Sequence, residues 1–293
     1  SRYGALQADS VTFTAFDTSD AWGGLWYDQQ AIDDSTINYL KNSTVAHATA
    51  GVYCESSSPT ITNTVFRYNT DGIFSDNGSQ PNIYGNTFIE NTRPVMVYSD
   101  DIRGGIYDNT YTNNTKNYIE VIGSELTEHH GGVDYHWQND GAPYVVTETF
   151  RIYQNDDHAD NNQDRRSVLR IDPGTELQFY PGQYLYIGHD PNSRYGALQA
   201  DSVTFTAFDT SDHWGGLFYD DQAVDDTTIN YLRNSIVEYA VRGVYWENSN
   251  PQIRNNQFRN NDTPVQVHAD MIRGNNKYNS YTNNTKNYIE VLG

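Results

Sequence analysis

The chain has 293 residues, with 18 Lys and Arg against 38 Asp and Glu, which gives a net charge of −20 at pH 7. A surface this acidic argues against nucleic acid and anionic membranes as partners, because both attract basic proteins. No apolar run in the sequence approaches the roughly 20 residues of a membrane-spanning helix, so we expect no membrane insertion by this segment.

Most of the chain consists of two copies of one sequence unit. The first 20 residues recur without a change at 193–212, and residues 111–121 recur unchanged at 281–291. The copies are offset by 192 residues at the front and by 170 at the back, a difference of 22. The second copy therefore lacks one turn of a smaller repeat. The pattern that starts at Pro59 and again at Pro81 occurs only once in the second copy, at Pro251.

The smaller repeat has a period near 22 residues and contains short β-type runs separated by Asn, Gly and Pro. This pattern is typical of a solenoid, in which each rung buries its apolar side chains against the rungs above and below. Loss of a whole rung preserves the inward and outward alternation of its neighbours, whereas loss of part of a rung reverses it. We expect the first apolar position to form one interior column and the second another. The repeated positions are Leu40/Ser43/Val45/Ala48, Ile61/Thr64/Phe66/Asn69, Ile83/Asn86/Phe88/Asn91 and Ile106/Asn109/Tyr111/Asn114.

The rung pattern P-x-I-x-x-[TN]-x-F-x-x-N at 59–69 and 81–91 resembles the right-handed parallel β-helix repeat of the pectate-lyase-like superfamily. The runs at 169–179 and 196–217 look like the opening rungs of β-helix domains in large secreted or cell-surface proteins of bacteria and archaea. The resemblance implies an all-β fold, a right-handed parallel β-helix (β-solenoid) in two tandem blocks, and an extracellular or cell-surface location. It implies little about activity, because the superfamily includes lyases, hydrolases, epimerases, adhesins and inert scaffolds.

We divide the chain into a first β-helix block at 1–123, a linker at 124–143 and a second block at 144–293 that is one rung shorter in its repeated part. The linker shows neither the 22-residue pattern nor strand alternation. The chain starts within a rung series and stops where the next connecting segment should begin, so we expect it to be part of a longer tandem array.

A polar loop in the second block is crowded with carboxylates. Ca²⁺ prefers six to eight oxygen ligands on a flexible loop, so calcium is the one cofactor that the sequence suggests. The loop lacks the glycine and the terminal Glu of an EF-hand. The alternative is a solvated acidic loop. The candidate calcium ligands are Asp156, Asp157, Asp160 and Asp164.

Polysaccharide lyases need acidic calcium ligands beside an Arg or Lys, and hydrolases need paired carboxylates. The nearest catalytic candidates are Asp100 and Arg103, with the counterparts Asp270 and Arg273 in the second copy. The neighbouring Asp76 and Asp101 are not shared by both copies. An acidic groove would also repel polyuronates. The alternative, which we favour, is an ordinary turn with a surface ion pair.

Exposed aromatic rings offer a different function, because they stack on sugars. The chain has 24 Tyr and 5 Trp. The candidates for a carbohydrate-binding face are Trp26, Tyr53, Tyr245 and Trp246, which alternate with Leu or Val expected to point inward. The alternative is that these rings stack on one another within the solenoid.

Five Asn-x-Ser/Thr sequons are candidate glycosylation sites: Asn42, Asn77, Asn113, Asn261 and Asn283. The alternative is that Asn and Thr are simply frequent at β-helix turns. There, Asn tolerates the left-handed backbone conformation, and its amide group can form hydrogen bonds along the stack.

The sequence as a whole favours a non-enzymatic extracellular structural or adhesive repeat module within a tandem array, filament or surface layer. Its expected partners are copies of itself, neighbouring repeats or a surface polysaccharide. The near-identity of the copies favours a spacer or assembly role. The alternatives are a carbohydrate-active β-helix enzyme, either a polysaccharide lyase or a hydrolase, and a glycan-binding module.

Overall fold

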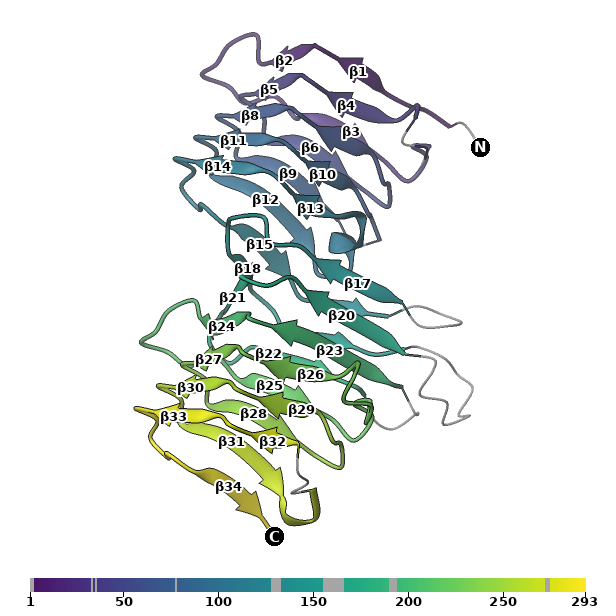
Figure 1. Cartoon of the computed structure of the whole chain (residues 1–293). Helices are drawn as coiled ribbons and strands as arrows, with labels where there is room; N and C mark the ends of the chain where they lie inside the picture. Colours follow the sequence, from purple (N-terminus) through teal and green to yellow (C-terminus); the bar gives the residue numbers. More distant parts are fainter. Residues whose placement is uncertain are drawn as a thin grey trace. The chain divides into compact units, whose positions relative to one another are not determined.

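The structure, a computed structural model, describes residues 3–32, 34, 36–76, 78–127, 133–154, 166–189, 194–271 and 275–293. These residues form short strands and two 3₁₀ helices, η1 (Asp101–Gly104) and η2 (Ala269–Met271), and no α-helix occurs among them. The strands pair in parallel with their equivalents in neighbouring rungs (Figure 1). The predicted all-β parallel solenoid is confirmed. No helix in the described part is long and apolar enough to cross a membrane.

The chain divides into two compact units, unit 1 (Ser1–Ile122 with Trp137–Tyr144) and unit 2 (Gly123–His136 with Val145–Gly293). Unit 1 has three parallel sheets. The first contains β1 (Gln7–Asp9), β4 (Tyr39–Lys41), β7 (Thr60–Thr62), β10 (Asn82–Tyr84) and β13 (Ile106–Tyr107). The second contains β2 (Thr12–Thr14), β5 (Thr44–Ala46), β8 (Val65–Arg67), β11 (Thr87–Ile89) and β14 (Thr110–Thr112). The third contains β3 (Leu25–Tyr27), β6 (Ala50–Cys54), β9 (Asp71–Ser75), β12 (Arg93–Tyr98) and β15 (Ile119–Ile122).

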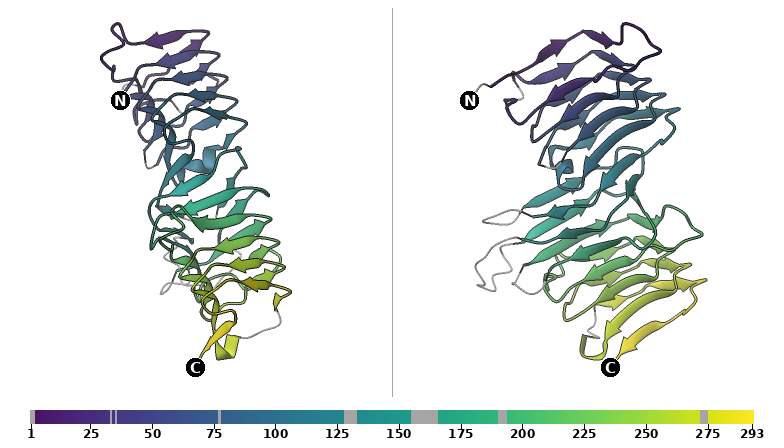
Figure 2. Two further views of the ribbon diagram at one scale, coloured as in Figure 1. Left: turned by 90° about the vertical axis from the view of Figure 1, so that its left-hand side faces the viewer. Right: turned by 180° about the vertical axis from the view of Figure 1, so that it is seen from behind.

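Unit 2 repeats this arrangement, and both views of Figure 2 show its strands stacked one above another. One sheet contains β17 (Asp134–Trp137), β20 (Ser167–Ile171), β23 (Gly196–Asp201), β26 (Tyr231–Arg233), β29 (Gln252–Arg254) and β32 (Asn276–Lys277). Another contains β18 (Tyr144–Val146), β21 (Glu176–Phe179), β24 (Thr204–Ala207), β27 (Ile236–Glu238), β30 (Gln257–Arg259) and β33 (Ser280–Thr282). The last contains β16 (Glu125–Leu126), β19 (Phe150–Ile152), β22 (Tyr184–Ile187), β25 (Gly216–Tyr219), β28 (Arg242–Trp246), β31 (Thr263–His268) and β34 (Ile289–Leu292).

Both predicted interior columns of unit 1 are confirmed. The aliphatic column pairs residue by residue in register and is fully buried, with at most 1% of any side chain exposed; its members are Leu40, Ile61, Ile83 and Ile106. The second column also pairs in register; its members are Val45, Phe66, Phe88 and Tyr111. Its aromatic rings are stacked face to face at centroid distances of 5.1 and 5.3 Å. Both columns follow from alternation, since only every second side chain of a strand points inward.

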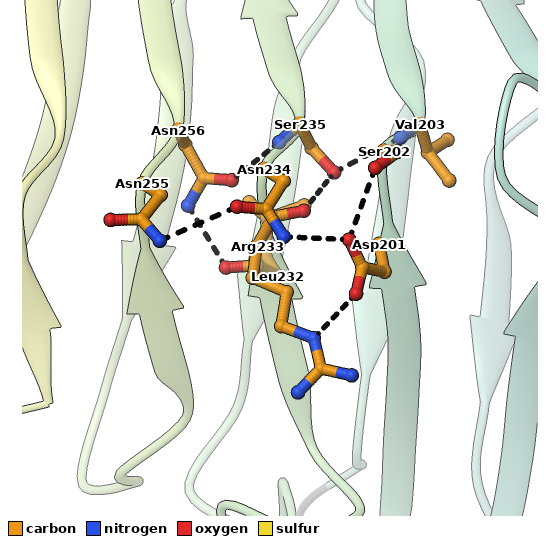
Figure 3. Close-up of polar contacts among 9 residues, drawn as sticks. All are labelled: Asp201, Ser202, Val203, Leu232, Arg233, Asn234, Ser235, Asn255 and Asn256. Carbon is orange, nitrogen blue, oxygen red and sulfur yellow. Dashed lines mark hydrogen bonds and ion pairs between the residues drawn. The ribbon is translucent and has the colours of Figure 1, made fainter.

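Asparagines serve two distinct structural purposes. Buried asparagines form ladders: Asn91 Oδ1 accepts a hydrogen bond from the backbone N–H of Asn69 at 3.0 Å, and Asn91 Nδ2 donates to the carbonyl of Phe66 at 2.9 Å. Exposed asparagines such as Asn63 instead hold the left-handed conformation at corners, with φ of 50°. Figure 3 shows the buried kind in unit 2, where Asn256 Nδ2 donates to the carbonyl of Leu232. Both purposes were expected for Asn in this repeat.

The segment expected to be a linker, 124–143, differs from that expectation because it contains strands β16 and β17. Val133, Tyr135 and Trp137 are all buried, with Trp137 completely enclosed. Tyr135 and Trp137 lie in β17, and Val133 directly precedes it. These three residues alternate with polar ones, which is the usual pattern of a strand with one buried face, so the prediction of no strand alternation in this segment was wrong.

Residues 137–144 pack with unit 1 and end its asparagine ladder. The carboxylate of Asp140 accepts hydrogen bonds from the Asn109 backbone N–H at 2.7 Å, from Asn109 Nδ2 at 2.9 Å and from the Tyr111 hydroxyl. Asp140 is only 4% exposed, and this burial raises its pKa. Its side chain thus satisfies donors that would otherwise lack partners at the last rung.

Candidate functional site

The acidic turn that held the catalytic candidates is built around a buried carboxyl group. Asp101 is 2% exposed; its Oδ2 accepts a hydrogen bond from Ser75 Oγ at 2.9 Å, and its Oδ1 accepts one from the Gly78 backbone N–H at 3.1 Å. Burial first, and then the charge of Asp100, raises the pKa of Asp101 to about 8. At neutral pH this carboxyl group is largely protonated and enclosed, which suits a structural group better than a site facing substrate.

The other candidates of this turn lie around the two 3₁₀ helices, and the Arg103 backbone N–H donates to the carbonyl of Asp100 at 3.4 Å. Asp100 is half-buried and precedes η1, whereas Arg103 is exposed at the end of η1. In unit 2, Asp270 is exposed within η2, and its companion Arg273 lies outside the described residues. The assignment of a catalytic role to these residues stays a prediction.

The second copy has Met271 in the place of Asp101, and the structure supplies the reason. Two of the hydrogen-bond partners of Asp101, Ser75 and Gly78, belong to the 22 residues that the second copy lacks. A buried carboxyl group without these two partners would lose much of the hydrogen bonding that offsets its burial, so an apolar side chain is the better occupant. Met271 is accordingly 8% exposed.

The raised pKa of Asp101 gives a pH-dependent stability with a defined sign. A carboxyl group with a higher pKa in the folded chain binds its proton more tightly there. The stability it contributes is therefore present below the unfolded pKa of 3.8 and is lost as the pH rises through about 8. We compare the free energy of unfolding of the unmodified chain with that of Asp101→Asn. Between pH 3.8 and about 8, the value for the unmodified chain should fall relative to the variant by up to about 1.4 kcal/mol per pH unit. Urea unfolding of both proteins from pH 4 to pH 9 measures this difference, and a constant difference would contradict it.

An outward aromatic column runs along the third sheet of unit 1. Trp26, Tyr53 and Phe74 pair in register, and their rings pack edge to face at centroid distances of 5.0 and 5.1 Å. Trp26 is 68% exposed, and its Nε1 donates to Glu55 Oε2 at 3.1 Å. The Tyr53 hydroxyl donates to Asp76 Oδ2 at 2.8 Å; burial, followed by this hydrogen bond, raises the pKa of Tyr53 to about 12. Trp26 is thus exposed as expected, and Tyr53 is half-buried by its neighbours.

The two carbohydrate-binding candidates of unit 2 are not exposed, which corrects the expectation. Trp246 is 4% exposed because it lies two positions after Val244 and therefore points to the same, inward side of β28. Tyr245 points outward but is only 8% exposed, since Phe218 and His268 cover its ring. Neither side chain can present a face to a sugar.

A pocket of about 500 Å³ lies beside Trp26 at the N-terminal rung of unit 1. Tyr3, Leu6 and Leu25 supply apolar surface, and Asp28 and Asn38 supply polar groups. Apolar walls with a few polar groups are the usual composition of a ligand site. No sequence motif predicts this pocket, because residues from separate parts of the chain form it.

The sequons occupy different environments. Asn42, Asn113 and Asn283 are exposed at left-handed corners, and Asn42 Nδ2 donates to Asp9 Oδ1 at 2.9 Å. Asn261 corrects the expectation: it is 1% exposed, and its Nδ2 donates to the carbonyl of Val237 and to Asn284 Oδ1 within the ladder. A glycan cannot be attached there in the folded protein. Asn77 lies outside the described residues.

The predicted calcium ligands Asp156, Asp157, Asp160 and Asp164 also lie outside the described residues. Among the residues that are described, no group of three or more His, Cys, Asp and Glu side chains could hold a metal ion. The calcium site stays a prediction.

Comparison with known protein families supports the β-helix fold. Residues 7–150 match a family model described as a right-handed beta helix region. The comparisons with curated proteins and with solved structures gave no match. The matched range begins at β1 and includes all the strands of unit 1, in agreement with their parallel stacking.

Proposed function

Because the chain is a right-handed parallel β-helix repeat protein, we propose that it is a non-enzymatic, extracellular structural or adhesive repeat module, part of a longer tandem array, filament or surface layer. Its partners in this proposal are copies of itself or neighbouring repeats, together with a surface polysaccharide. The observation that carries the proposal is that both units use their repeated polar residues to join one rung to the next.

The shared interior asparagines support this reading. In unit 1 the Asn91 backbone N–H donates to Asn114 Oδ1 at 2.9 Å, and in unit 2 the Asn261 backbone N–H donates to Asn284 Oδ1 at 2.9 Å. Fully satisfied buried polar networks rigidify a fold and fix its register. A module that transmits load or sets spacing needs both properties.

One cluster of charged side chains, on the third sheet of unit 1, is paired internally. Arg93 forms a two-point ion pair with Asp71 at 2.6 and 3.0 Å, and it also contacts Glu120 at 3.2 Å. Lys116 reaches the same glutamate at 2.7 Å. A base that removes a proton from a substrate must be free to approach it, so this cluster favours stability over catalysis.

The proposal is tested by assaying cleavage of pectin, alginate and chondroitin, with Ca²⁺ added. We expect no product above that of a heat-denatured control, because Asp101 is enclosed and Arg93 is paired. A protein that cleaves one of these polymers, and loses that activity in Arg103→Ala, would establish the enzyme alternative instead.

The same polymers test the glycan-binding alternative, which the exposed ring of Trp26 favours. Retardation of the protein in a gel containing polysaccharide, without cleavage, would indicate binding. The matched variants are Trp26→Ala, which removes the exposed ring, and Trp246→Phe, which changes only an enclosed one. Retardation that only Trp26→Ala abolishes would show an adhesive role.

A further inference from the structure

The N-terminal rung of unit 1 exposes side chains whose counterparts of identical sequence are buried in unit 2. Tyr3 and Val11 are 69% and 38% exposed, whereas the equivalent Tyr195 and Val203 are 8% and 1% exposed. The 20 residues that contain these side chains do not differ between the copies. The difference in burial therefore comes from what lies on the rung and not from its sequence.

Unit 2 shows what covers the equivalent rung. Strand β22 pairs in parallel with β25 over its whole length, with Leu185 opposite Leu217 and Ile187 opposite Tyr219 (Figure 1). Strands β20 and β21 pair in the same way with β23 and β24. The pocket of unit 1 is lined by the counterparts of these covered residues, including Leu25 and Tyr27. The pocket thus lies on the surface that, in unit 2, is covered by the preceding rung.

Two glycines of unit 1 also indicate that a rung covers this surface. A Cβ atom on Gly196 would lie 1.9 Å from the carbonyl oxygen of Ile152, and one on Gly215 would lie 2.4 Å from the ring of Tyr184. Residues of β19 and β22 therefore require glycine at these two positions. At the counterparts Gly4 and Gly23, nothing lies within 4 Å, and neither has a positive φ. Within the described part of unit 1, no steric or backbone constraint requires glycine there.

A buried side-chain amide that lines this pocket lacks a hydrogen-bond partner. Asn38 is 0% exposed and lines the pocket, and its Nδ2 has no hydrogen-bond partner among the described residues. The equivalent Asn230 Nδ2 donates at 2.8 Å to the carbonyl of Val224, which lies six residues earlier in the same rung. An unpaired buried amide is unfavourable, so the uncovered rung of unit 1 holds this amide less well than the covered rung of unit 2 does.

We propose that strands β1, β2 and β3 form a stacking surface, and that its occupant is a β-solenoid rung with the chemistry of β20, β21 and β22, supplied by a further copy of residues 144–192. The inference rests on the proposed function, since a repeat module would supply such a rung. Free strand edges provide the backbone donors and acceptors. Apolar residues of the kind found at Leu185 and Ile187 fill the pocket.

The experiment adds a second copy of residues 144–192 directly before Ser1, so that the new junction repeats the one that precedes Ser193. Hydrogen exchange of the β1, β2 and β3 amides is measured at a dilute concentration. We expect their exchange to slow by about tenfold or more relative to the unextended chain, because a paired strand opens less often. The matched control carries Leu185→Asp and Ile187→Asp in the added copy alone and should give no protection.

The two glycines supply a second test. Gly4→Val with Gly23→Leu should leave the melting temperature of the unextended chain undiminished, because both side chains enter open space. The same pair should abolish the protection in the extended chain. Protection that survives both substitutions, or that never appears, would overturn the proposal. So would protection of the unextended chain that appears only at high concentration or only with added glycan, because another occupant would then be responsible. Polysaccharide cleavage would refute the proposed function without altering this exchange result.

Discussion

Deletion of residues 70–91 together with Asp101→Met should leave a folded, cooperative protein that is one rung shorter. The deletion joins Asn69 to Thr92, and this junction matches the one the second copy already uses at Asn261 and Asp262. Strand β6 would then meet β12 as β28 meets β31, with Val52 opposite Val95. The added substitution removes the buried carboxyl group, whose partners Ser75 and Gly78 leave with the deleted rung.

The matched control deletes only residues 81–91. This shorter deletion removes an odd number of residues, 11, and reverses which side chains face inward downstream. We expect it to lose cooperative unfolding and to bind a hydrophobic dye, whereas the whole-rung variant keeps its β-sheet circular dichroism and a single sharp transition. Equal loss of structure in both variants would show that the rung is not the modular unit.

The interior columns could be predicted from the sequence because their signal is local and repeated. Ile61 and Ile83 recur at the rung period, and the second copy shows that one whole rung can be omitted. The strand in the expected linker was missed although Tyr135 and Trp137 alternate with the polar Asp134 and His136, as in a strand with one buried face. The alternation is short, and the segment lacks the 22-residue repeat that identified the other strands.

The environment of the candidate site depended on contacts that the sequence does not display. Asp101 is enclosed because Ser75, 26 residues earlier, lies beside it in the neighbouring rung. Trp246 was assigned to the outer face, although its separation of two residues from Val244 places both on the inner face. The pocket near Tyr3 lies on a rung that is uncovered in unit 1. The equivalent rung of unit 2 is covered, as the pairing of β22 with β25 shows.

The asparagine ladder should be among the largest single contributors to stability. Asn91→Ala would leave the Asn69 backbone N–H and the Phe66 carbonyl without their present partners in a site where Asn91 is only 1% exposed. Each buried group left unpaired costs about 1–3 kcal/mol, so we expect the free energy of unfolding to fall by about 2–6 kcal/mol. Urea unfolding followed by circular dichroism measures the change.

The matched control for this prediction is Asn63→Gly, which changes an asparagine of the other kind. Asn63 is exposed and holds φ of 50°, a conformation that glycine adopts without strain. We expect a change within about 0.5 kcal/mol, as for most surface substitutions. Equal effects at both positions would mean that the buried amide hydrogen bonds add little, and that packing of the columns alone holds the rungs together. A large loss confined to Asn91 would place rung-to-rung cohesion in the ladder that both units share.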